Sequence, residues 1–235
     1  MDIRSPWSTP AGNVWQLTEH LRDGPQAGKW APMIFHFIRQ SMRNPVTVGA
    51  VLPSGTRLAR AMAVAALPNE RGPMRILEVG PGTGPITAQL HRRLRPGDEL
   101  NVVELNGEFC ALLRKKFPEV PIHQQSILEY EPAERVHCIV SGLPLANFPA
   151  DVVTAIYQHF FKLLVPGGRL IMFHYIGLRH AIRAVAGRND RERMDRILAL
   201  EASLEPLVVG QVRVSLNIPP AIVTVRRRPD DPLLT

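Results

Sequence analysis

The sequence predicts an α/β fold in which a mainly parallel sheet is covered by helices on both faces. Strand-like and helix-like segments alternate after residue 74, which is typical of parallel sheets built from strand–helix–strand units. A loop with three glycines joins the first strand of this series to its first helix. The last two strand-like segments are separated only by residues 217–220, which leaves no room for a helix and indicates an antiparallel pair at the sheet edge.

The expected elements follow from hydrophobic periodicity and from turn residues. Strands are expected at 75–79, 100–104, 120–123, 136–141, 169–174, 207–216 and 221–227. Helices are expected at 56–67, 86–94, 107–117, 150–164 and 188–203. Ser54 is placed to cap the first of these helices, because serine is a favoured N-cap residue.

A separate amphipathic helix is expected at residues 29–43, within an N-terminal extension that covers residues 1–54. Its apolar face would carry Trp30, Met33, Ile34, Phe37, Ile38 and Met42, and its other face Lys29, His36, Arg39, Gln40 and Arg43. A basic helix with aromatic residues on its apolar side is suited to a membrane interface. The alternative is a terminal helix that packs on its own domain, residues 55–235.

The composition favours an anionic partner. The chain has 28 basic and 21 acidic residues, a net charge of +7, which suits nucleic acid or an acidic membrane surface, although a simply basic soluble protein is the alternative. The two cysteines, Cys110 and Cys138, have no partner at metal-ligand spacing, so no metal site is expected. With no signal-peptide pattern and no apolar stretch of about 20 residues, a cytoplasmic location is expected, compatible with peripheral attachment to a membrane.

The loop at residues 80–84 has the layout of a nucleotide-type cofactor site. In open parallel sheets a ligand lies outside the carboxyl ends of the strands, where this loop and Glu104 both end. Glu104 can accept hydrogen bonds from two ribose hydroxyls. A nicotinamide dinucleotide also fits this arrangement, but the loop lacks GxGxxG spacing, and Glu78 just before it favours a cofactor with a positive centre.

These residues resemble a known family. The run EVGPGTG at 78–84 and the run VVEL at 102–105 look like motif I and the second-strand acid of class I S-adenosylmethionine-dependent methyltransferases. The resemblance covers about residues 55–227 and implies a Rossmann-like seven-stranded sheet with one reversed edge strand, with S-adenosylmethionine as cofactor and S-adenosylhomocysteine as product. The cofactor-binding residues that it implies are Glu78, Gly80, Gly82, Gly84, Glu104, Leu105, Gln125, Ser126 and Ser141. Many members have an acidic residue where this chain has Gln125.

The segment SGLPL at 141–145 bears on the methyl acceptor. It resembles the NLPY-type motif of ribosomal RNA adenine dimethyltransferases, in which main-chain carbonyls hold the target amine and an aromatic side chain stacks on the base. The resemblance implies roles for Ser141 and Leu143 at the amine. Leu145 stands where the aromatic residue is expected, and a base would lose a stacking contact of about 1–3 kcal/mol.

Three segments together resemble bacterial phospholipid N-methyltransferases: NPVTVGAVLPSG at 44–55, SGLPL, and NIPPA at 217–221. The resemblance implies N-methylation of an aminolipid headgroup, phosphatidylethanolamine or ornithine lipid, at the inner face of the cell membrane. It implies an anionic membrane surface as partner, bound through the helix at 29–43, and no nucleic acid. Two alternatives stay open, a ribosomal RNA adenine N6-methyltransferase and a non-enzymatic membrane- or RNA-binding protein. The oligomeric state is open.

Methyl transfer to an amine requires a neutral nucleophile, so a proton must leave. His174 and Tyr175 end the fifth expected strand and are candidates to hold the amine or relay the proton, with strand packing as the alternative for each. The expected membrane- and substrate-contacting residues are Trp30, Ile34, Phe37, Ile38, Arg39, Arg43, Pro53, Ser54, Arg179 and Arg183. A simple capped loop is the alternative for Pro53 and Ser54, and a solvated helix face is the alternative for Arg179 and Arg183.

Overall fold

The computed structural model describes residues 53–177, 187–217 and 219–230. The expected helix at 29–43 lies outside the described residues, together with Trp30, Ile34, Phe37, Ile38, Arg39 and Arg43. Arg179 and Arg183 lie outside them as well. No helix in the described ranges is long and apolar enough to cross a membrane.

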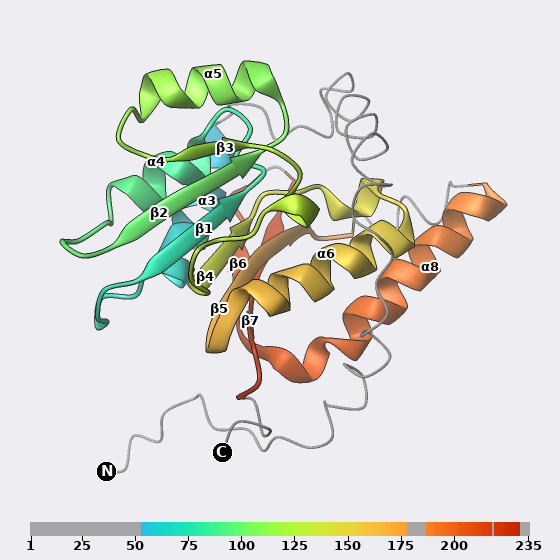
Figure 1. Cartoon of the computed structure of the whole chain (residues 1–235). Coiled ribbons are helices and arrows are strands. Elements are labelled where there is room, and N and C mark those ends of the chain that lie inside the picture. The colour runs from blue at the N-terminus through green and yellow to red at the C-terminus, as the bar shows by residue number, and fades with distance from the viewer. Residues whose placement is uncertain (1–52, 178–186, 218, 231–235) are drawn as a thin grey trace, which may run out of the picture.

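A seven-stranded sheet forms the centre of the fold, with strand order β3-β2-β1-β4-β5-β7-β6 (Figure 1). The strands are β1 (Arg75–Val79), β2 (Glu99–Glu104), β3 (Ile122–Gln124), β4 (Val136–Ser141), β5 (Leu164–Tyr175), β6 (Val208–Val214) and β7 (Ala221–Arg227). The first five strands pair in parallel, whereas β7 runs antiparallel to both β5 and β6. This confirms the Rossmann-like methyltransferase sheet with its reversed edge strand.

Helices cover both faces of the sheet (Figure 1). One face carries α3 (Pro53–Ala66), α4 (Pro85–His91) and α5 (Gly107–Lys116), and the other carries α6 (Ala150–Leu163) and α8 (Arg188–Ser203). Three short 3₁₀ turns, η2 (Ile127–Glu129), η3 (Leu145–Asn147) and η4 (Glu205–Leu207), complete the described elements.

Two apolar clusters, one on each face, fix the helices to the sheet. Alternation along β1 sends Ile76 into the cluster with α3 and α4 and Leu77 into the cluster with α6 and α8. Both side chains are fully buried. The central strand is therefore anchored from both sides, so the loop that follows it starts from a fixed point.

Several boundaries differ from the sequence-based expectation, most of them by one to three residues at an end of the element, and those of α3, β5 and β3 have structural reasons or consequences. Helix α3 begins at Pro53, so Ser54 lies in its first turn and does not precede it, and a domain boundary after residue 54 falls inside the helix. Proline is tolerated there because the first turn needs no N–H partner. Strand β5 starts at Leu164 and passes through a register shift, with Gly167 at φ 71°. Strand β3 is shifted to Ile122–Gln124.

Candidate functional site

The loop after β1 depends on glycine. Gly80, Gly82 and Gly84 have φ values of 67°, 58° and 87°, a backbone region that side chains disfavour. A Cβ on Gly80 would lie 2.6 Å from Cδ2 of Leu143, and one on Gly84 would lie 2.8 Å from Cδ2 of Leu113. Both the dihedral angles and the close neighbours therefore require glycine in this loop.

Glu104, at the carboxyl end of β2, holds the glycine loop in place. Its Oε2 accepts a hydrogen bond from the Gly82 N–H at 3.1 Å, and its Oε1 accepts one from the Asn106 N–H at 2.8 Å. Burial raises the pKa of Glu104, while backbone N–H groups of Asn106, Gly82 and Leu105 act in the opposite direction. An ionised carboxylate accepts about four hydrogen bonds, so Glu104 retains capacity for a further hydroxyl donor beside these backbone N–H groups.

Glu78 lies in β1, directly before the loop, and is fully buried. No hydrogen bond of ordinary length reaches its carboxylate oxygens or the Thr87 hydroxyl on α4 from a described residue. Burial raises the pKa of Glu78 to about 8; longer contacts from the Thr87 hydroxyl and N–H oppose this rise, and the charge of Glu104 adds to it. A buried carboxyl group with only weak partners is costly to ionise, and a positive charge nearby would offset that cost.

These features fit S-adenosylmethionine. The methionine portion of this cofactor is positively charged at its sulfonium, which matches two neighbouring carboxyl groups, and its ribose has two hydroxyls to donate to Glu104. The backbone of Gly80, Gly82 and Gly84 presents no side chain to a ligand. Glu78, the glycine loop and Glu104 are therefore the residues that would hold it.

The segment after β4 is packed directly against the glycine loop. The Gly142 N–H donates to the Val79 carbonyl at 2.8 Å, and a Cβ on Gly142 would lie 2.5 Å from the Gly80 carbonyl oxygen. The Ser141 hydroxyl is buried and accepts a hydrogen bond from the Leu143 N–H at 3.3 Å. The structure thus brings Ser141 and Leu143 to the same sheet edge as the predicted cofactor residues.

The residues at the end of β3, where the adenine of the cofactor is expected, have several contacts within the protein. The Ser126 hydroxyl is buried and caps η2 by accepting from the Leu128 N–H at 3.3 Å. Gln125 is partly buried. Gln124, which pairs with Glu104 in the sheet, lies close to the start of α5, since a Cβ on Gly107 would be 3.0 Å from its Nε2.

His174 and Tyr175 point to opposite faces of the sheet. Leu170 and Met172 belong to the α6 side and Phe173 and Tyr175 to the α3 side, so strand alternation puts His174 on the α6 side. The same alternation in β4 puts Ser141 on that side. Tyr175 stacks edge to face on Phe173, with ring centroids 5.4 Å apart, and burial raises its pKa. Of the two candidates, His174 shares a face with Ser141.

Sequence reasoning did not single out Asn106, Thr87 or Gly142. Asn106 caps α5 by accepting from the N–H groups of Glu108 and Phe109, while its own N–H binds Glu104. An Asn directly before a helix with Glu at its start is a recognisable capping signal. Gly142 was visible only as part of SGLPL, and nothing in the sequence shows that it contacts Gly80.

Comparisons with known proteins identify a methyltransferase domain in this chain. A family model described as a methyltransferase domain matches residues 76–168, which run from β1 into β5. An ornithine lipid N-methyltransferase of Singulisphaera acidiphila is 28% identical over 143 residues, covering 57% of this chain and 73% of that protein. A ribosomal RNA small subunit methyltransferase A of Porphyromonas gingivalis is 32% identical over 114 residues, covering 46% of this chain and 40% of that protein.

A solved structure shares the fold. The N-methyltransferase NodS from Bradyrhizobium japonicum in complex with S-adenosyl-L-homocysteine has a TM-score of 0.54 and 16% identity, covering 93% of this chain and 100% of that chain. Over residues 76–168 the chain matches a methyltransferase domain, and as a whole it resembles class I S-adenosylmethionine-dependent methyltransferases, the aminolipid N-methyltransferases among them.

Proposed function

We propose that this enzyme transfers a methyl group to the headgroup amine of a membrane aminolipid, phosphatidylethanolamine or an ornithine lipid. The observation that carries the proposal is the burial of the apolar side chains in the segment after β4. Leu145, where a base-stacking aromatic residue is expected, is 4% exposed and belongs to the core, and the nearby aromatic Phe148 is fully buried. Neither side chain is available to stack on an extruded adenine. The ornithine lipid N-methyltransferase relative supports the same acceptor class.

The chemistry needs a positioned, neutral amine. S-adenosylmethionine supplies a methyl group on a sulfonium leaving group, so the protein contributes mainly by positioning. In this proposal main-chain carbonyls at Ser141 and Leu143 hold the amine, and His174 accepts its proton, because it lies on the same sheet face as Ser141. His174→Gln should lower kcat more at low pH than at high pH, where the amine loses its proton without help.

We further propose that the carboxyl edge of the sheet faces the bilayer. Leu216, in the turn between β6 and β7, is 70% exposed, and its carbonyl accepts a hydrogen bond from the Arg57 side chain at 3.3 Å. An exposed leucine beside an arginine suits the boundary between lipid headgroups and acyl chains. The proposed amphipathic helix at 29–43 would add Trp30 and Phe37 to this attachment.

The test is methyl transfer from labelled S-adenosylmethionine to vesicles. Vesicles that contain phosphatidylethanolamine or ornithine lipid should yield methylated lipid, identified by mass spectrometry, and binding should rise with anionic lipid and fall with salt. Replacing Trp30, Phe37 and Ile38 with serine should abolish vesicle binding and leave cofactor affinity unchanged. If the purified protein ignores anionic vesicles and methylates no lipid, the proposal is wrong.

The second candidate is a ribosomal RNA adenine N6-methyltransferase. The relatives with that role and the net charge of +7 favour it. It requires methylation of unmodified small-subunit ribosomal RNA with no need for lipid. The same labelled cofactor, offered to this RNA and to aminolipid vesicles in parallel, separates the two candidates directly.

A further inference from the structure

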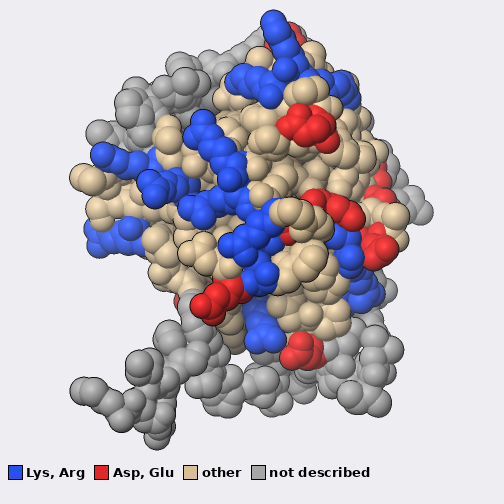
Figure 2. Space-filling model, turned by 90° about the vertical axis from the view of Figure 1, so that its left-hand side faces the viewer, with Lys and Arg blue, Asp and Glu red and all other residues tan. Residues whose placement is uncertain are grey.

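A hollow lined by four arginines lies at the amino-terminal edge of the parallel strands, opposite the cofactor site. Its volume is about 290 Å³, and its lining residues are Leu67, Pro68, Asn69, Arg71, Arg92, Arg93, Leu94 and Arg95. Figure 2 shows this face of the molecule, where Lys and Arg side chains gather into a band. The five residues of β1 separate it from the glycine loop by about 16 Å. The hollow is therefore not part of the methyl-transfer site.

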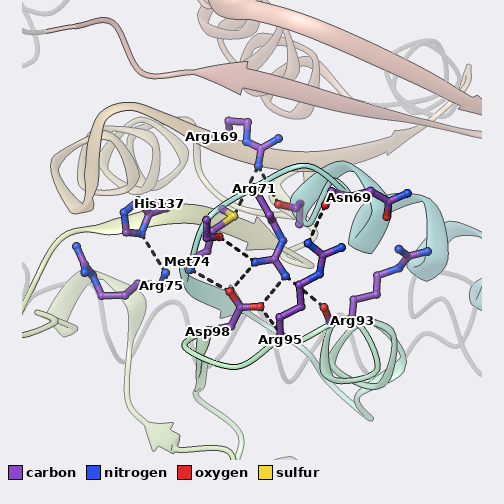
Figure 3. Close-up of polar contacts among 11 residues, drawn as sticks. Asn69, Arg71, Met74, Arg75, Arg93, Arg95, Asp98, His137 and Arg169 are labelled. Carbon is purple, nitrogen blue, oxygen red and sulfur yellow. Dashed lines mark hydrogen bonds and ion pairs between the residues drawn. The ribbon is translucent and has the colours of Figure 1, made fainter.

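Arg71 is held rigidly at this hollow. Its Nη1 and Nη2 donate to Oδ1 and Oδ2 of Asp98 at 2.5 Å and 2.6 Å, and Nη2 also donates to the Arg93 carbonyl at 3.2 Å (Figure 3). The two side chains are 6% and 0% exposed. The buried Nε of Arg71 has no hydrogen-bond partner among the described residues. A donor that is buried and unpaired is unfavourable, and an anion is its natural partner.

The remaining arginines differ in how they are held. The Arg95 side chain donates to the Asn69 carbonyl at 2.7 Å, which fixes its guanidinium across the hollow (Figure 3). The Arg92 and Arg93 guanidiniums form no hydrogen bond or ion pair with any residue in the described ranges. Among the described residues Asp98 is the one carboxylate paired to the lining arginines, so the four guanidiniums carry three positive charges in excess.

We propose that this hollow binds a small molecule that carries a diphosphate group. One phosphate carries about −1.5 to −2 charges at pH 7, so a diphosphate balances the excess better than a single phosphate. Guanidinium forks match phosphate oxygens in bidentate geometry. Leu67, Pro68 and Leu94 supply an apolar border for an organic portion of the ligand. The distance from the glycine loop makes this molecule neither methyl donor nor acceptor.

The test is calorimetric titration of the full-length protein with inorganic pyrophosphate, without cofactor or lipid. The double variant Arg92→Gln/Arg93→Gln removes the two unpaired guanidiniums, and a matched control, Arg196→Gln/Arg213→Gln, removes two exposed arginines elsewhere. We expect the first double variant to bind pyrophosphate at least about tenfold more weakly than wild type, since hydrogen bonds to charged groups are strong. The control should bind as wild type does.

Three results would overturn the proposal. Equal weakening in both double variants would reduce the hollow to a general positive surface, and an absence of binding at millimolar pyrophosphate would mean that the hollow is not a diphosphate site. In the third, a 20-nucleotide single-stranded RNA binds wild type, does not bind Arg92→Gln/Arg93→Gln and is not displaced by pyrophosphate, which would assign the surface to a polynucleotide. Equal melting temperatures for the three proteins establish that the variants fold.

Discussion

At the scale of single residues, Glu78 links the charge of the site to ligand affinity. Its pKa of about 8, raised by burial and by Glu104, means that the carboxyl group is largely protonated at neutral pH without a ligand. A cationic cofactor beside it favours the ionised form. Affinity for S-adenosylmethionine should therefore rise from pH 6.5 to pH 8.5, as measured by calorimetry at constant ionic strength. Glu78→Gln should flatten this dependence, and a variant that keeps the full slope would contradict the assignment.

The same residue predicts a stability effect in the cofactor-free protein. Because the folded-state pKa is raised from 4.5 to about 8, the contribution of Glu78 is fully present below the unfolded value and is lost as pH rises through about 8. Wild type should lose melting temperature relative to Glu78→Gln between pH 5 and pH 8.5. Comparing the two proteins at each pH cancels the effect of other titrating groups, including His123, His137 and His159, whose pKa values burial lowers.

A further prediction at the residue scale concerns Glu104. Glu104→Ala should weaken cofactor binding by about 1.5–3 kcal/mol, the size of hydrogen bonds to a charged group. Its loss also frees the Gly82 N–H, so the loop loses its tie to β2. The control is Glu99→Ala, an exposed carboxylate at the other end of the same strand. Unchanged affinity in Glu104→Ala, measured by calorimetry, would mean that Glu104 does not contact the cofactor.

At the residue scale the sequence indicated which residues form the cofactor site but not which hydrogen bonds they make with one another. The glycine spacing, Glu78 and Glu104 were all readable, because each stands at a fixed place relative to a strand end. The bond from Gly82 to Glu104 spans 22 residues and depends on how two strands pair, so no local pattern reveals it. The predicted roles of Gln125, Tyr175 and His174 stay predictions.

At the scale of elements, the contact between the loops after β1 and β4 gives a sharp test. Gly142→Ala places a Cβ 2.5 Å from the Gly80 carbonyl oxygen, and backbone on both sides must move. We expect a loss of about 1–3 kcal/mol in the free energy of unfolding in urea, together with weaker cofactor binding. Gly72→Ala is the matched control, because a Cβ there meets nothing within 4 Å. Equal effects of the two substitutions would show that the loops are not in contact.

Element boundaries were predictable where a pattern stops sharply. Strands β1, β4 and β7 and helix α8 match the expected ranges. The early start of β5 was not predictable. A proline and two glycines near its start are typical of a strand break, whereas the strand continues through them with a register shift. The contact of Arg169 with the last carbonyls of α3, at Ala65 and Ala66, is also invisible in sequence, since it joins residues more than 100 positions apart.

At the scale of the whole molecule, the sheet separates two apolar clusters that should contribute independently to stability. Ile76 is fully buried in the cluster with α3 and α4, and Ile156 is fully buried in the cluster with α6 and α8. Each Ile→Val substitution should cost about 0.5–1.5 kcal/mol. The double variant should equal the sum within roughly 0.5 kcal/mol in urea unfolding. A larger deviation would mean that the clusters are coupled through the sheet.

The overall topology was predictable because alternation of strands and helices leaves few arrangements. The reversed edge followed from the four residues between the last two strands, too few for a crossover helix. The arginine hollow was not predictable: Arg71 and Asp98 lie on separate loops, 27 residues apart, and meet only because β1 and β2 are neighbours.

The contact between Gly142 and the first loop has a consequence for engineering. The hydrogen bond from the Gly142 N–H to the Val79 carbonyl joins the strand before the glycine loop to the segment 141–145, which we propose binds the acceptor, and a Cβ at position 142 would clash with the Gly80 carbonyl oxygen. Residues 78–84 and residues 141–145 are packed against each other, so we expect that they must be exchanged together. A chimera that takes residues 141–145 from a relative with a different acceptor should work only if residues 78–84 come with them.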